Sequence, residues 1–69
     1  MSIYRDRLSE LYGHDVGSVV GCGLDRLGRD VSSAEIRKAV EHYNANREHF
    51  DVLPIGARRG LVAELFATS

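Results

Sequence analysis

Along most of this chain, apolar residues recur every three or four positions, which is the period of an α-helix. No stretch alternates with a period of two for long enough to predict a sheet. The pattern therefore predicts an all-α fold, a compact bundle of about four short helices joined by short turns. The clearest apolar stripe lies in the second of these helices and comprises Val16, Val19, Val20, Leu24 and Leu27.

Residues typical of helix ends set the bounds of the first two helices. The first is predicted over residues 2–12, where Gly13 can close it in the left-handed conformation. The second is predicted over residues 15–27, with Asp15 as its N-cap and Gly28 as its C-terminal stop. The stripe of the first helix that we expect in the core comprises Tyr4, Leu8, Leu11 and Tyr12.

The third helix has the most specific start signal in the chain. Ser32 and Glu35 stand at the spacing of a capping box, in which each side chain accepts the backbone N–H of the other residue. Val31 and Ile36 stand at the spacing of the hydrophobic staple that accompanies such a box. Two independent signals therefore predict a helix that begins at Ser32 and continues to about His49. Its expected inner face comprises Ile36, Ala39, Val40, Tyr43 and Phe50.

The fourth helix is predicted to start near Pro54, because proline is favoured in the first turn of a helix. Gly56 and Gly60 weaken this prediction, since glycine is a poor helix former. The sequence leaves open whether residues 54–67 form one continuous helix. The stripe expected in the core comprises Ile55, Leu61, Val62, Leu65 and Phe66.

Size and cysteine content restrict the class of protein. The 69 residues make a single helical domain over residues 1–69, whose small core is marginal on its own. The single cysteine, Cys22, excludes an internal disulfide, so we expect support from a partner chain or a homo-oligomer. The N-terminus lacks the apolar core of a signal peptide, and no apolar run would span a membrane. We therefore expect a cytoplasmic protein with a reduced thiol.

The charge balance adds a further restriction. The 9 basic residues against 10 acidic residues give a net charge of −1, and the signs are mixed along the chain. A protein that binds nucleic acid or a membrane surface non-specifically normally shows a basic excess. Nucleic acid is therefore the less favoured class of partner, and a membrane is not expected.

The second predicted helix contains an unusual number of glycines, although each interior glycine costs about 1 kcal/mol relative to alanine. Gly17, Gly21 and Gly28 fall on one narrow strip beside the apolar stripe. Such a strip allows another backbone to approach closely. One interpretation is close packing within this chain, and a second is a groove at Gly17 and Gly21 for a partner helix or for self-association. A third is that the segment is not a continuous helix.

Arg58 and Arg59 fall in the first turns of the fourth helix, where the helix dipole disfavours a cation. Free amides at a helix N-terminus with arginines nearby would suit an acidic partner or a phosphate. The alternative is an internal ion pair with Asp51, Glu48 or Glu64, or side chains that lie along apolar surface.

No combination of residues indicates catalysis or metal binding. Cys22 has no histidine at a spacing that would activate it. His42 and His49 are seven residues apart, which separates them by roughly 10 Å on a helix, too far to share one metal ion. We therefore predict no catalytic, cofactor-binding or metal-binding residues and expect a protein that is not an enzyme.

These observations favour a small non-enzymatic protein-interaction or regulatory module. It would dock on a larger protein or self-associate through helix faces. The residues predicted to bind the partner are Gly17, Gly21, Arg58 and Arg59.

The alternative is a helix-turn-helix DNA-binding transcriptional regulator. The second and third helices, joined by the turn at residues 28–31, have about the right lengths for this motif. The helix from about Ser32 would be the recognition helix. Acidic residues on the same surface weaken this alternative, because phosphate contacts dominate DNA affinity. The residues predicted to face DNA are Ser33, Arg37, Lys38 and Asn44.

Overall fold

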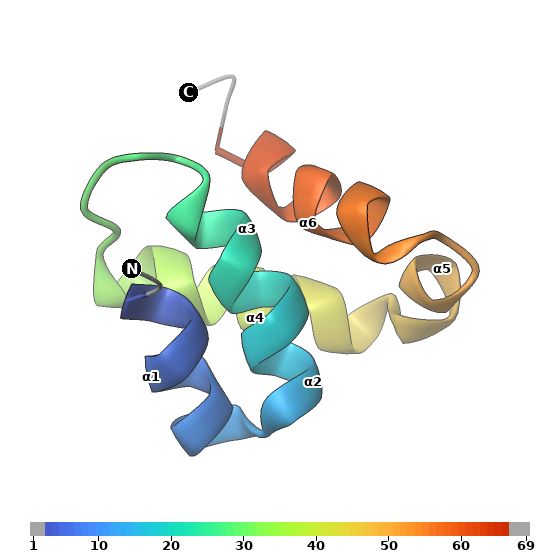
Figure 1. Cartoon of the computed structure of the whole chain (residues 1–69), viewed down its shortest axis with the longest axis horizontal. Helices are drawn as coiled ribbons and strands as arrows, with labels where there is room; N and C mark the ends of the chain where they lie inside the picture. Colours follow the sequence, from blue (N-terminus) through green and yellow to red (C-terminus); the bar gives the residue numbers. More distant parts are fainter. Residues whose placement is uncertain (1–2, 67–69) are drawn as a thin grey trace.

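The computed structural model describes residues 3–66, and all the regular secondary structure among them is helical (Figure 1). The prediction of an all-α bundle is therefore confirmed. None of the helices in this range is long and apolar enough to cross a membrane. In chain order the elements are α1 (Ile3–Tyr12), α2 (His14–Val16), the π-helix η1 (Gly17–Gly21), α3 (Cys22–Asp25), α4 (Ser33–Ala45), α5 (Arg47–Asp51) and α6 (Ile55–Glu64).

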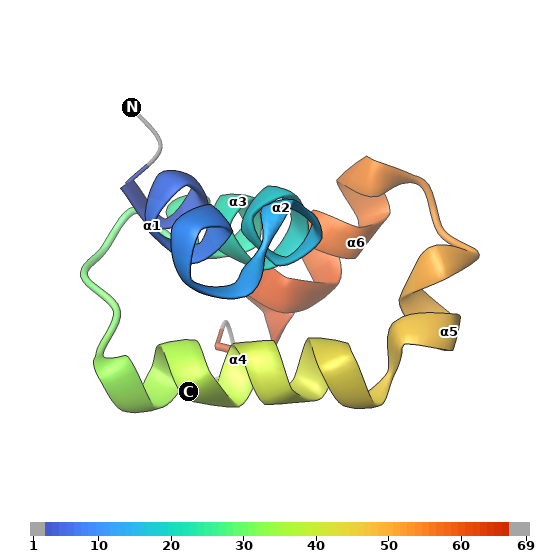
Figure 2. The same ribbon diagram turned by 90° about the horizontal axis from the view of Figure 1, so that it is seen from below.

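The elements α2, η1 and α3 follow one another without a break and form one helical segment in the middle of the molecule. α1 packs against this segment, mainly at η1, and α6 packs mainly against α3. α4 runs beneath them as a separate layer, and the chain returns through α5 to α6 (Figure 2). The core between these layers comprises Leu8, Val16, Val19, Val20, Leu24, Val31, Ala39, Val40, Tyr43, Phe50, Val62 and Phe66.

The chain buries about as much surface as a monomer of its mass should. Its accessible surface is 4478 Å², and the scaling law for compact monomers gives about 4,300 Å² for a chain of this mass. Every buried side-chain nitrogen and oxygen in the described part of the chain has a hydrogen-bond partner. The folded chain is therefore compact without a second copy.

The packing of α1 depends on two glycines of η1. A Cβ atom at Gly17 would lie 2.8 Å from the carbonyl oxygen of Arg5. A Cβ atom at Gly21 would lie 2.7 Å from the backbone nitrogen of Arg5 and 2.8 Å from the carbonyl oxygen of Tyr4. All three distances are shorter than van der Waals contact, so α1 fits here only because these positions lack a side chain. Of the three interpretations of the glycines, close packing within the chain is confirmed for Gly17 and Gly21. It is wrong for Gly28, which lies beyond the end of α3 with no atom within 4 Å of a Cβ placed there.

Gly23 has the same role for α6. A Cβ atom at Gly23 would lie 2.7 Å from Cβ of Val62 and 2.9 Å from the carbonyl oxygen of Arg59. The Arg59 side chain also links α6 to the π-helix, because its Nε donates a 2.8 Å hydrogen bond to the carbonyl oxygen of Ser18. Residues 17–23, which we call the glycine segment, therefore hold α1 through Gly17 and Gly21 and α6 through Gly23.

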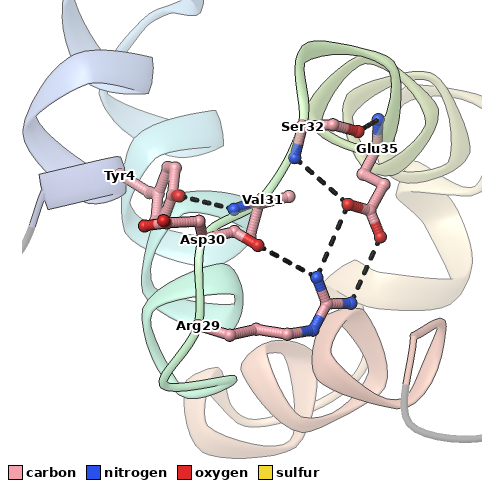
Figure 3. Close-up of polar contacts among 6 residues, drawn as sticks. All are labelled: Tyr4, Arg29, Asp30, Val31, Ser32 and Glu35. Atoms are coloured by element: carbon pink, nitrogen blue, oxygen red, sulfur yellow. Dashed lines mark hydrogen bonds and ion pairs between the residues drawn. The ribbon is translucent and has the colours of Figure 1, made fainter.

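The start of α4 agrees with the prediction. Ser32 Oγ accepts the N–H of Glu35 at 3.2 Å, and the Glu35 carboxylate accepts the N–H of Ser32 at 3.1 Å. The Arg29 guanidinium lies 3.2 Å from Glu35 Oε2 and reinforces this capping box (Figure 3). The Tyr4 hydroxyl accepts the N–H of Val31 at 2.8 Å, so α1 also fixes the chain where it enters α4.

The N-terminus of α1 is capped from a distant part of the chain. The Asp25 carboxylate accepts the N–H of Tyr4 at 3.1 Å and the N–H of Arg5 at 3.4 Å. Asp25 is the last residue of α3, and the predicted stop follows at Gly28, which has a positive φ of 66°. A carboxylate near free amides at a helix N-terminus is favourable, so the pairing joins the ends of α1 and α3.

The turn between α1 and α2 differs in one detail from the prediction. Gly13 has the expected positive φ of 105°, and its N–H donates to the carbonyl oxygen of Ser9 at 3.1 Å. The next helix begins directly afterwards at His14, with Gly13 as its N-cap. Asp15 therefore lies in the first turn of α2, and its prediction as the N-cap is wrong.

The predicted third helix is broken near its C-terminal end. α4 ends at Ala45 because Asn46 leaves the helical conformation, with φ −123° and ψ 29°. The Asn46 side-chain amide donates to the carbonyl oxygen of His42 at 2.9 Å, a local bond of the kind that competes with helix continuation. The short helix α5 then leads in a new direction (Figure 2).

Three predicted core residues are exposed: Leu11 by 66%, Tyr12 by 47% and Ile55 by 43%. α1 meets the glycine segment through the backbone of Tyr4 and Arg5, so its buried face is rotated from the one predicted and Leu11 faces solvent. Tyr12 is the last residue of α1 and Ile55 is the first residue of α6.

The glycine segment generates a stability prediction. Gly21→Ala should destabilise the protein by about 2 kcal/mol or more, because the added methyl group meets the backbone of α1. Gly56→Ala is the matched control, since nothing lies within 4 Å of a Cβ atom there. Chemical denaturation should show the control unchanged or stabilised by up to about 1 kcal/mol. Equal stability of both variants would contradict the close approach.

The capping box generates a pH prediction. The hydrogen bond from Arg29 and the backbone bond at Ser32 hold the pKa of Glu35 below its ordinary value of 4.5. A lowered pKa stabilises the fold above the ordinary value, and this contribution is lost as the pH falls through the folded pKa. The wild type should therefore exceed Glu35→Gln in stability at pH 7, and the difference should shrink below about pH 4.5.

Denaturation curves of both proteins between pH 7 and pH 2 measure this difference. Glu41→Gln provides a control, because Glu41 is an exposed glutamate on the same helix. A Glu35→Gln difference that stayed constant across this range would contradict the assignment.

Candidate docking surface

Two grooves meet where α4, α5 and α6 come together. The smaller, with a volume of about 370 Å³, lies between the α4–α5 region and α6. The larger, about 700 Å³, lies on the other side of Asn46 and His49, which line both grooves. The smaller groove is lined by His42, Asn46, His49, Phe50, Leu61, Glu64 and Leu65. The larger is lined by Asn44, Ala45, Asn46, Arg47, Glu48, His49 and Val52.

The break at Asn46 creates these grooves. Because α5 turns away from α4, Phe50 can pack edge-to-face on Tyr43, with ring centroids 5.0 Å apart, and on His42 at 5.9 Å. Phe50 is 1% exposed and anchors α5 to the core. The partly buried residues Leu61 and Leu65 of α6 pack against the same core and line the groove opposite α5.

An apolar turn of four residues, 52–55, projects beside the grooves. Val52 is 79% exposed, the largest value among the exposed large hydrophobic residues of the described chain. Pro54 and Ile55 are also exposed. Leu53 is partly buried, so three of the four apolar residues of this turn are exposed. We call the two grooves together with this turn the docking corner.

Arg58 holds the apolar turn in place. Its Nε donates to the carbonyl oxygen of Leu53 at 2.8 Å, and its second guanidinium nitrogen donates to that of Asp51 at 3.0 Å. These two carbonyls flank Val52 in the sequence. The turn is thus ordered in advance of any binding, which lowers the entropy cost of docking.

The predicted partner-binding residues Gly17 and Gly21 lie elsewhere. Both are buried under α1, so the folded chain leaves no space for a partner helix on this strip. Gly17 and Gly21 serve to pack α1 against η1, and they are not part of the docking corner.

Arg58 and Arg59 are both partly buried and form hydrogen bonds within the chain. The expected ion pair with the carboxylate of Asp51, Glu48 or Glu64 does not form, because both guanidinium groups bind main-chain carbonyls instead. Arg58 contributes to the docking corner by positioning the turn, whereas Arg59 supports the glycine segment. Binding of a partner by either arginine stays a prediction.

The predicted DNA-facing residues are all exposed on α4: Ser33, Arg37, Lys38 and Asn44. The connection before α4 spans residues 26–32, which is longer than the three- or four-residue turn typical of a helix-turn-helix motif. The same helix exposes Glu41. DNA binding therefore stays a prediction, with geometry that fits the motif less well than the sequence suggested.

The described residues hold no group of three or more histidine, cysteine, aspartate or glutamate side chains arranged for a metal ion. Cys22 is partly exposed as a free thiol. His42 and His49 are exposed, and both line the smaller groove.

Most residues of the docking corner were not singled out by the sequence pattern. Phe50, Leu61 and Leu65 were assigned to the core as parts of amphipathic stripes. The available signals were the pair Asn44 and Asn46 near a predicted helix end and the apolar run before Pro54. Asparagine favours helix termini.

Comparisons with protein-family models, with curated proteins and with solved structures found no match to this chain.

The role of Arg58 can be tested by Arg58→Gln. Losing two hydrogen bonds from a partly buried cation should destabilise the protein by about 1 kcal/mol. The amide of Leu53, which bonds to the carbonyl oxygen of Phe50, should exchange faster with solvent. Arg37→Gln is the control, because Arg37 is exposed on α4. Indistinguishable exchange at Leu53 in the two variants would show that Arg58 does not order the turn.

Proposed function

We propose that the protein is a small non-enzymatic interaction module that docks on a larger protein through the docking corner. The observation that carries the proposal is the apolar turn, with Val52 79% exposed and its backbone held by Arg58. A rigid apolar projection beside a concave surface is a favourable binding element, because little order is lost on docking.

The composition of the corner also supports docking. Interface centres combine apolar anchors in desolvated pockets with a polar rim. Here Leu61 and Leu65 line the smaller groove, and the polar residues Asn46, His49 and Glu64 surround them. The groove offers apolar contact area together with groups that can set the orientation of a partner.

The accessible surface of 4478 Å² supports a monomer that docks rather than a chain that folds only within an oligomer. It is close to the area expected for an independent monomer. Homo-oligomerisation is therefore not required by this proposal. The free thiol of Cys22 is consistent with a cytoplasmic setting, which forms part of the proposal.

Substitution of Val52 tests the proposal. Val52→Asp should leave the fold intact, because the side chain is 79% exposed, but should abolish docking by placing a charge where an apolar contact forms. Leu11→Asp is a matched control, since Leu11 is 66% exposed on α1. In cross-linking pull-downs from the source cells, partners retained by Leu11→Asp should be lost with Val52→Asp. Identical partner sets for both variants would overturn the proposal.

A further inference from the structure

The hydrogen-bond register of the central helical segment changes within the glycine segment. In an α-helix the N–H of Cys22 would donate to the carbonyl oxygen of Ser18, four residues earlier. Here it donates to the carbonyl oxygens of Gly17 and Val19, five and three residues earlier, at the end of the π-helix. The carbonyl of Ser18 therefore loses the amide that a continuous α-helix would give it.

An arginine from α6 takes the place of this amide. Arg59 Nε donates a 2.8 Å hydrogen bond to the carbonyl oxygen of Ser18, across 41 residues of sequence and in a partly buried site. A backbone carbonyl that is shielded from water needs a donor, and a bond from a charged donor is stronger than a neutral one. The Arg59 bond therefore compensates the π-helix for the partner that Ser18 has lost.

The π-helix also sets the angle between the two glycine contacts. Each residue of an α-helix turns the chain by about 100°, and a π-helical hydrogen bond spans one residue more than an α-helical one. Residues after the π-helix consequently lie about 100° from where a continuous α-helix would place them. Gly17 meets α1 at the start of the π-helix, and Gly23 meets α6 after its end. The two contacts together require the π register.

From the register and the arginine bond together, we propose that Arg59 is a latch on a helix that has two registers. While α6 is in place, Arg59 binds Ser18 and the segment stays in the π register. When α6 moves away, the N–H of Cys22 takes the Ser18 carbonyl, and the segment becomes α-helical. This change rotates α3 by about 100° relative to α2. The latch thus couples the position of α6 to the rotation of α3, and it does not depend on the proposed docking function.

Hydrogen-bond couplings in the isotope-labelled protein test this proposal. They connect an amide nitrogen with the carbonyl carbon that accepts its N–H, so they report the register directly. In the wild type the amide of Cys22 should couple to the carbonyl of Gly17. Arg59→Met keeps an unbranched side chain but removes the donor. In this variant the coupling to Gly17 should be lost and replaced by a coupling to Ser18.

Arg59→Lys is the matched control, because its ammonium group keeps a charged donor at the end of an unbranched side chain. It should retain the coupling from Cys22 to Gly17. Retention of this coupling in Arg59→Met, or its loss in both variants alike, would overturn the latch. A coupling from Cys22 to Ser18 in the wild type would overturn it as well.

Deletion of Ser18 provides a second arm that does not depend on the stability of Arg59→Met. Removing one residue lets the segment adopt the α register without rotating α3, so the shortened chain should fold. It also removes the carbonyl that Arg59 binds. Arg59→Met should therefore lower the midpoint of chemical denaturation in the full chain and leave it nearly unchanged in the shortened chain. An equal decrease in both chains, or a shortened chain that does not fold, would overturn the proposal.

Discussion

The close approach of two helix backbones to the glycine segment is the constraint on which the rest of the structure depends. Gly17 and Gly21 bring α1 into contact with η1, and Gly23 brings α6 against α3. In a chain of 69 residues few apolar side chains are present to hold the layers together. Close backbone packing adds dispersion contacts that such a core would otherwise lack. These contacts offset the cost of placing glycines inside a helix.

From this packing the other elements take their positions. α1 carries Tyr4, whose hydroxyl fixes the chain before α4, while Asp25 at the end of α3 caps α1 in return. α6 is held at Gly23 and through the bond from Arg59 to Ser18, so its leucines face the space beside α5. None of the residues that line the two grooves belongs to the glycine segment.

Local signals in the sequence predicted the all-α fold and the start of α4, because the capping box involves residues only three positions apart. Which face of each helix packs against the core was harder to predict. The rotation of α1 that exposes Leu11 follows from where the glycines allow contact, which is a tertiary property. The break at Asn46 brings Phe50 onto Tyr43, a contact that exists only in the folded chain. The docking corner depends on that break. Because the sequence pattern predicts one helix through His49, the pattern does not predict the docking corner.

The most direct measurement of the central claim is the proximity of backbone protons across the two glycine contacts. In a nuclear Overhauser spectrum of the labelled protein, the α-protons of Gly21 should show strong cross-peaks to the backbone of Arg5. Those of Gly23 should show cross-peaks to the side chain of Val62. Both sets together would establish that the glycine segment holds α1 and α6. Their absence in a folded, well-dispersed spectrum would contradict the account.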